Sequence, residues 1–167
     1  MKAWLHRGFT LIELMVAMTI LILLLVLAMP GYVLWMSDSE IRNATESAAS
    51  GLRFAQATAI SSNRNAQFVL NAAGWNVAMV DTPLVSIQTA AFSEGGKNVT
   101  IAALPAGATT VAFNALGQVI PDPANLTQVN LSMPASTRPL TVLVGNGRTG
   151  VKICDPNLAP TDPAGCP

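Results

Sequence analysis

A long apolar segment near the N-terminus constrains this chain more than any other feature. The 28 residues from Phe9 to Met36 contain one charged side chain, Glu13. At about 1.5 Å rise per residue, a helix of this length crosses the ~30 Å hydrocarbon core of a bilayer. Lys2 and Arg7 precede the segment. This positive charge predicts that the N-terminus stays in the cytoplasm and that the rest of the chain is exported.

Two simpler interpretations are a cleaved secretory signal peptide and a plain transmembrane anchor. A signal core usually spans ~7–15 apolar residues, which is shorter than this segment. The candidate cleavage region, Leu27–Pro30, is also a poor small-x-small site. Neither interpretation explains Glu13. A charge in hydrocarbon costs roughly 3 kcal/mol on insertion scales, so such a residue usually marks a functional site.

The residues at the start of the segment form a motif. They read Gly8-Phe9-Thr10-Leu11-Ile12-Glu13-Leu14. Followed by an apolar helix, this motif resembles the class III leader of type IV pilins and pseudopilins. The resemblance implies that a prepilin peptidase cuts after Gly8 and methylates the new N-terminal residue, Phe9. The apolar helix is then retained, and Glu13 corresponds to the glutamate that the family carries five residues into the mature chain.

Simple electrostatics supports an assembly role for Glu13. Cleavage after Gly8 would create a free amine on Phe9 in apolar surroundings. A buried amine and a buried carboxylate are each costly alone but neutralise each other when paired. We therefore expect Glu13 of one subunit to pair with the Phe9 amine of a neighbour, which would set the axial register of a filament.

The sequence pattern divides the chain into four regions. Residues 1–8 are the expected leader and residues 9–36 the apolar transmembrane or assembly helix. Residues 37–63 continue this helix in amphipathic form, and residues 64–167 form a β-rich globular domain. The predicted fold class is therefore α+β, a long N-terminal helix packed on a C-terminal antiparallel β-sheet domain.

The amphipathic part of the helix carries one small apolar face. Its members recur at spacings of three and four, as on one side of a helix. They are Ile41, Ala44, Ala48, Leu52, Ala55 and Ala59. We expect this face to pack on the sheet. Pro30 and Gly31 mark a weak point in an otherwise continuous helix, since proline removes a backbone donor.

Short β-type runs with turn residues between them begin at Ala66. The expected strands are 67–70, 75–80, 99–103, 110–114, 118–120, 128–132, 140–144 and 151–154. Asn71–Gly74 is expected to join the first two as a hairpin, and Trp75 is expected in the core. The region from Pro83 to Arg138 carries no recognisable motif, and its loops leave an adhesive role open.

The sequence at the end of the helix points to one branch of this family. Residues 52–63 read Leu-Arg-Phe-Ala-Gln-Ala-Thr-Ala-Ile-Ser-Ser-Asn. This stretch resembles the GspH/FimT branch of minor pilins and pseudopilins, and the Gly74-Trp75 hairpin and the Gly147-Arg148 segment are similar to that branch as well. The resemblance implies an inner-membrane protein whose globular domain is periplasmic. Its partners would be other pilins or pseudopilins, contacted through the N-terminal helix.

Two cysteines, Cys154 and Cys166, lie close to the C-terminus. Because we expect export to an oxidising compartment, we predict that they form a disulfide. In the loop-entropy model, a disulfide that closes a loop of this size stabilises the folded chain by ~3 kcal/mol. Free thiols or a metal site are the alternative. The chain's one histidine, His6, lies in the expected leader, so we expect no metal.

Neither the charge balance nor the motifs of the chain indicate a nucleic-acid-binding domain or an enzyme. From Ser37 onward the chain has eight acidic and seven basic residues, so no net field draws the domain to nucleic acid. We find no nucleophile–base pair and no phosphate-binding glycine motif, and we expect no catalytic activity and no cofactor. Asp122 and Asp155 lie beside prolines, as turn residues usually do.

One local basic element runs from Gly145 to Lys152. FimT-like pilins carry a Gly-Arg-x-Arg motif here that is associated with DNA binding. This chain has Arg148, but Gly150 stands in place of the second arginine, and Lys152 is the nearest substitute. Each phosphate contact contributes a salt slope of roughly −0.9, so two contacts would bind DNA weakly. The alternative is a glycine turn with solvated basic side chains.

Besides the adhesive role of the loops, three functions remain open from the sequence. The favoured one is a minor pilin of a type IV pilus, near its tip. A minor pseudopilin of a type II secretion system shares the same architecture. A DNA-binding pilin, acting in natural transformation through Arg148 and Lys152, is the third.

Overall fold

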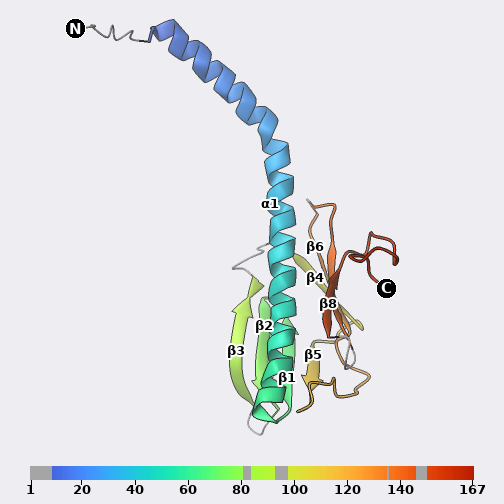
Figure 1. The fold of residues 1–167 in the computed structure, drawn as a ribbon. Coiled ribbons are helices and arrows are strands. Elements are labelled where there is room, and N and C mark those ends of the chain that lie inside the picture. Colours follow the sequence, from blue (N-terminus) through green and yellow to red (C-terminus); the bar gives the residue numbers. More distant parts are fainter. Residues whose placement is uncertain (1–8, 81–83, 93–97, 135, 146–149) are drawn as a thin grey trace, which may run out of the picture. The chain divides into compact units, whose positions relative to one another are not determined.

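The computed structural model describes residues 9–80, 84–92, 98–134, 136–145 and 150–167. They fall into two compact units, with the division between Trp35 and Met36. A single 52-residue helix, α1 (Leu11–Ser62), contributes to both units (Figure 1).

The first unit is the apolar part of α1. Thr10 caps the helix, since its Oγ1 accepts a hydrogen bond from the Glu13 N–H (3.3 Å) and its carbonyl accepts one from the Leu14 N–H (3.2 Å). Every residue from Leu11 to Met36 is exposed. Pro30 lies inside the helix without ending it. The continuous helix predicted from the sequence is therefore confirmed.

The second unit joins the rest of α1 to two antiparallel sheets. Its strands are β1 (Ala66–Asn71), β2 (Gly74–Met79), β3 (Val85–Ala91), β4 (Thr100–Leu104), β5 (Thr110–Phe113), β6 (Gln128–Ser132), β7 (Leu140–Val144) and β8 (Val151–Cys154). The first sheet has the order β3-β2-β1-β5 and the second has the order β4-β6-β7-β8. The α+β class is confirmed.

The core lies between α1 and both sheets. All six residues of the predicted apolar face are at most 1% exposed, and they share one core cluster with Phe68, Val77, Val129 and Val142. Hydrogen bonds tie α1 to the domain on either side of this face. The Trp75 indole donates to Ser47 Oγ (3.0 Å), and Gln56 Nε2 donates to the Gly117 carbonyl (2.7 Å). Trp75 is buried, as predicted.

The observed strands differ from the expected set in two places: one strand was missed and one expected strand is absent. Val85–Ala91 forms β3, which the sequence pattern does not reveal. Its residues are mostly exposed, so no buried face imposes an apolar alternation. Residues 118–120 form no strand: Val119 makes only an isolated bridge with Phe113, and the chain then enters Pro121. The Asn71–Gly74 hairpin is confirmed, and Asn71 Oδ1 accepts the Ala73 N–H (3.0 Å) within it.

Candidate assembly site and C-terminal loop

Glu13 lies in the first turn of α1 and is exposed. The spacing Thr10-x-x-Glu13 is that of a capping box, and the half in which Thr10 Oγ1 accepts the Glu13 N–H is formed. A carboxylate at this position also complements the positive end of the helix dipole. Glu13 therefore has a local role at the helix start. Our sequence interpretation missed this role, although the spacing of the two residues indicates it.

The other residues of the predicted assembly site lie at the same end of the helix. Phe9 precedes α1 and is exposed, about one helical turn before Glu13. Gly8, the expected cleavage position, lies outside the described residues. A pair between the Phe9 amine and Glu13 of a neighbour involves a second subunit, so this role stays a prediction.

The part of the helix that follows Glu13 presents an apolar surface that stays exposed among the described residues. By length and composition it can cross a membrane, and none of the residues in its most apolar window is buried. A core helix of a soluble domain would bury such a window. The surface therefore suits lipid or the helices of other subunits.

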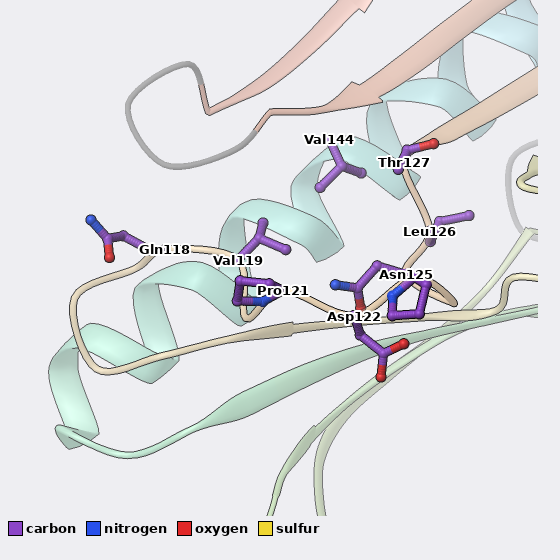
Figure 2. Close-up of a pocket in the computed structure, with 9 residues that line it drawn as sticks. Gln118, Val119, Pro121, Asp122, Asn125, Leu126, Thr127 and Val144 are labelled. Atoms are coloured by element: carbon purple, nitrogen blue, oxygen red, sulfur yellow. The ribbon is translucent and has the colours of Figure 1, made fainter.

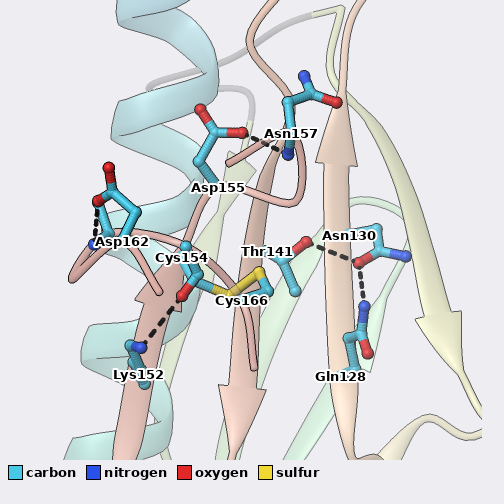
Figure 3. The surroundings of a disulfide bond; sticks show 11 residues. Gln128, Asn130, Thr141, Lys152, Cys154, Asp155, Asn157, Asp162 and Cys166 are labelled. Atoms are coloured by element: carbon cyan, nitrogen blue, oxygen red, sulfur yellow. Dashed lines mark hydrogen bonds between the residues drawn. A yellow bond between two sulfur atoms is a disulfide. The ribbon is translucent and has the colours of Figure 1, made fainter. Parts of the chain in front are cut away.

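The predicted disulfide is present between Cys154, at the end of β8, and Cys166 (Figure 3). Cys154 is buried. Two aspartates shape the loop that the bond closes: Asp155 Oδ1 accepts the Asn157 N–H (2.9 Å) and Asp162 Oδ1 accepts the Ala164 N–H (2.8 Å). Asp155 is thus a turn residue, as its neighbouring proline predicts.

The structure describes only one of the two residues of the predicted DNA contact, Lys152. Lys152 Nζ donates to the Gly165 carbonyl (3.1 Å), so the ammonium is held against the disulfide loop (Figure 3). Arg148 lies outside the described residues. A basic side chain that our sequence interpretation missed is Arg53, whose Nη2 donates to the Val151 carbonyl (3.3 Å) at the edge of β8.

A hollow of about 640 Å³ opens beside the segment that joins β5 to β6 (Figure 2). Its lining includes Val119, Leu126 and Val144. Two of its polar groups are held by the chain's own backbone: Asn125 Nδ2 donates to the Ile120 carbonyl (2.6 Å) and Asp122 Oδ1 accepts the Ala124 N–H (2.8 Å). These bonds shape the loop rather than aim polar groups at a ligand. Asp122 is a turn residue, as predicted.

Potential metal ligands do not gather in the described part of the chain. No group of three His, Cys, Asp or Glu side chains there is close enough to hold an ion.

Comparison with known families shows to which family the chain belongs. The family described as Type II transport protein GspH matches residues 44–148, and the prokaryotic N-terminal methylation motif matches residues 5–29. The first match covers more than half of the chain. The protein therefore belongs to the GspH family of minor pilins and pseudopilins.

Two solved structures share the fold. The crystal structure of the type IV minor pilin FimU from Pseudomonas aeruginosa gives a TM-score of 0.55 at 16% identity, over 76% of this chain and 97% of that chain. The solution structure of GspH from E. coli gives 0.52 at 16% identity, over 72% and 91%. A search of curated protein sequences found no match.

Proposed function

We propose that the protein is a minor pilin, a structural and assembly subunit of a type IV pilus near its tip. The observation that carries this proposal is α1. One continuous helix joins an exposed apolar segment, headed by Thr10 and Glu13, to the buried core stripe of a GspH-type domain. Such a helix serves both as an anchor in lipid and as the contact between subunits. The chain acts by assembly, without catalysis and without a cofactor.

Processing is part of this proposal. A prepilin peptidase removes residues 1–8 after Gly8 and methylates the Phe9 amine, and the match to the N-terminal methylation motif supports this step. Intact-mass measurement of the protein from its native host tests it. We expect a chain that begins at Phe9 and carries one added methyl group. A chain that still begins at Met1, or one cleaved near Ala28, would contradict the proposal.

In the assembled filament, Glu13 pairs with the Phe9 amine of a neighbouring subunit. Glu13→Ala should leave export and membrane insertion intact but strongly reduce incorporation into pili, because the buried amine then lacks a partner. Sheared pili probed by immunoblot measure incorporation. Thr19→Val, also in the apolar segment, is the matched control. Normal incorporation of the Glu13 variant would exclude the pairing.

A second candidate is a minor pseudopilin of a type II secretion system. The description of the matching family favours it, since it names a type II transport protein. Deletion of the gene separates the two systems. Loss of surface pili with normal secretion supports the pilin, and retained pili with blocked exoprotein secretion supports the pseudopilin.

A DNA-binding role in natural transformation is a third candidate, favoured by the position of Arg53 beside β8. Arg53 reaches the backbone of Val151, the residue that precedes Lys152. A mobility-shift assay at low salt tests it with the Arg148→Ala, Lys152→Ala double variant. We expect loss of the shift if these residues bind phosphates, whereas wild-type binding by the variant would exclude the site.

A further inference from the structure

Two aromatic side chains mark the end of the apolar part of α1. Tyr32 is 57% exposed and Trp35 is 67% exposed, and their ring centroids lie 6.1 Å apart. Three residues apart, they share one side of the helix. The next charged residues along the chain are Asp38 and Glu40. Exposed Tyr and Trp are typical of the bilayer interface, where the ring meets acyl chains and the polar tip meets headgroups.

The opposite end of the apolar segment is marked by Glu13. The helix begins there, with Thr10 as its cap. Between Glu13 and Tyr32 the segment carries no charge. The hydroxyl of Thr19 in this interval donates to the Val16 carbonyl (2.8 Å), so its polar group is satisfied within the helix. The interval therefore meets the requirement that polar groups in hydrocarbon find partners.

The distance along the helix between Glu13 and Trp35 matches the thickness of a bilayer core. Glu13 and Trp35 are 22 residues apart, which corresponds to about 33 Å along a helix. An ordinary tilt of about 20° reduces this to about 31 Å across the membrane. The hydrocarbon core is about 30 Å thick. When Trp35 lies at one boundary of the core, Glu13 thus reaches the other.

We infer that Tyr32 and Trp35 bind the outer headgroup region of a phospholipid bilayer and that they thereby hold Glu13 at the cytoplasmic boundary. This inference rests on the membrane anchor of the proposed function. It changes the state expected for Glu13 before assembly: the carboxylate is hydrated at the interface instead of buried in hydrocarbon. Burial of Glu13 then belongs to entry into the filament, where the neighbouring amine is available.

The depth of Trp35 is tested with the full-length chain in vesicles of phosphatidylcholine and phosphatidylglycerol. The lipids carry bromine either near the headgroups or near the bilayer centre. Trp4→Phe removes one of the other two indoles, Trp75 is buried in the domain, and the Trp35→Phe variant supplies the background. We expect quenching by the shallow bromines to exceed that by the deep bromines about twofold, as for an interfacial indole. Stronger quenching by the deep bromines would overturn the inference.

The depth at the other end is tested with nitroxide labels that leave Glu13 and the disulfide intact. Leu14→Cys places a label beside Glu13, and Leu24→Cys places one near the middle of the segment. The two leucines are matched in exposure, at 59% and 60%. We expect an aqueous nickel complex to relax the label at 14 and dissolved oxygen to relax the label at 24. Equal depth for both labels would overturn the inference.

The same samples separate this inference from the proposed function. A chain that floats with the vesicles but carries a deep label at position 14 would overturn the depth assignment alone. A chain that fails to float would overturn the membrane anchor, and the depth assignment with it.

Discussion

Gly51 shows how one residue sets the distance between α1 and the first sheet. A Cβ at this position would lie 2.7 Å from Cδ2 of Trp75 and 2.9 Å from Cε2 of Phe68. These two rings are stacked, with centroids 5.9 Å apart. Trp75 is also fixed by its hydrogen bond to Ser47 one turn earlier in the helix. The rings therefore have little freedom to move away from a larger side chain.

We expect Gly51→Ala to destabilise the domain by about 1–3 kcal/mol, because overpacking moves fixed core side chains. Helix propensity offsets part of this loss, by at most about 1 kcal/mol. Thermal unfolding of the full chain in detergent, followed by near-UV circular dichroism, measures the change. Gly31→Ala is the control, since a Cβ there meets nothing within 4 Å. An unchanged midpoint for Gly51→Ala would show that the rings relax freely.

The roles of single residues were predictable where a residue acts within its own turn or has only one possible partner. Cys154 and Cys166 had each other as the expected partners, and Asp122 and Asp155 lie in short-range turns that their own side chains form. The role of Arg53 was not predictable, because its acceptor on Val151 is 98 residues away in the sequence. Such a contact depends on the complete fold.

Among the elements, β3 depends on Gly74 of the neighbouring strand. Gly74 pairs with Ala91, and a Cβ at position 74 would meet the backbone of Ala90 and Ala91. Backbone cannot yield as a flexible side chain does. We expect Gly74→Ala to break the end of the β2–β3 pairing, so that amide hydrogen exchange in β3 becomes at least tenfold faster, a loss of roughly 1.4 kcal/mol. Unchanged protection in β6 and β7 is the internal control, and unchanged exchange in β3 would contradict the prediction.

Burial explains why some strands were predicted from the sequence and β3 was not. β6, β7 and β8 were predicted with their observed bounds, and β6 alternates buried and less buried residues. β3 is an edge strand, and its pairing with β2 is irregular at Val77 and Ala78. Because most of its residues are exposed, its sequence need not alternate between apolar and polar residues. Pairing with β2, rather than its own sequence, makes this segment a strand.

The disulfide holds the C-terminal loop to β8. Other described contacts of the loop include the bond from Lys152 to Gly165 and one of 3.4 Å from Asn157 Nδ2 to the Thr137 carbonyl. We expect the Cys154→Ser, Cys166→Ser double variant to lose about 3 kcal/mol, as the loop-entropy model gives for this ring size. Chemical unfolding with and without reductant measures the effect. Reductant should destabilise the wild type and leave the double variant unchanged; equal sensitivity of both would contradict a stabilising role.

At the scale of the whole molecule, one helix serves two units with opposite demands. Its apolar half is exposed along its full length, whereas its second half buries a stripe of mostly alanine residues in the domain. The sequence alone predicts this division, because the change from a continuous apolar run to a spacing of three and four is a strong periodic pattern. It does not predict that the core draws on both sheets, since that depends on pairings between distant strands.

The same division predicts where the chain can be shortened. A chain that begins at Met36 keeps all the apolar residues that the structure describes as buried, of which Ile41 is the first, and the hydrogen bond from Ser136 Oγ to Asp38 (2.5 Å). It should be soluble and unfold within about 3 °C of the full chain in detergent. A chain that begins at Thr45 loses Ile41 and Ala44, and deletion of a buried aliphatic side chain costs about 2–5 kcal/mol. Its midpoint should fall by about 10 °C. Aggregation of the Met36 chain, or equal midpoints for the two truncations, would show that the domain boundary lies elsewhere.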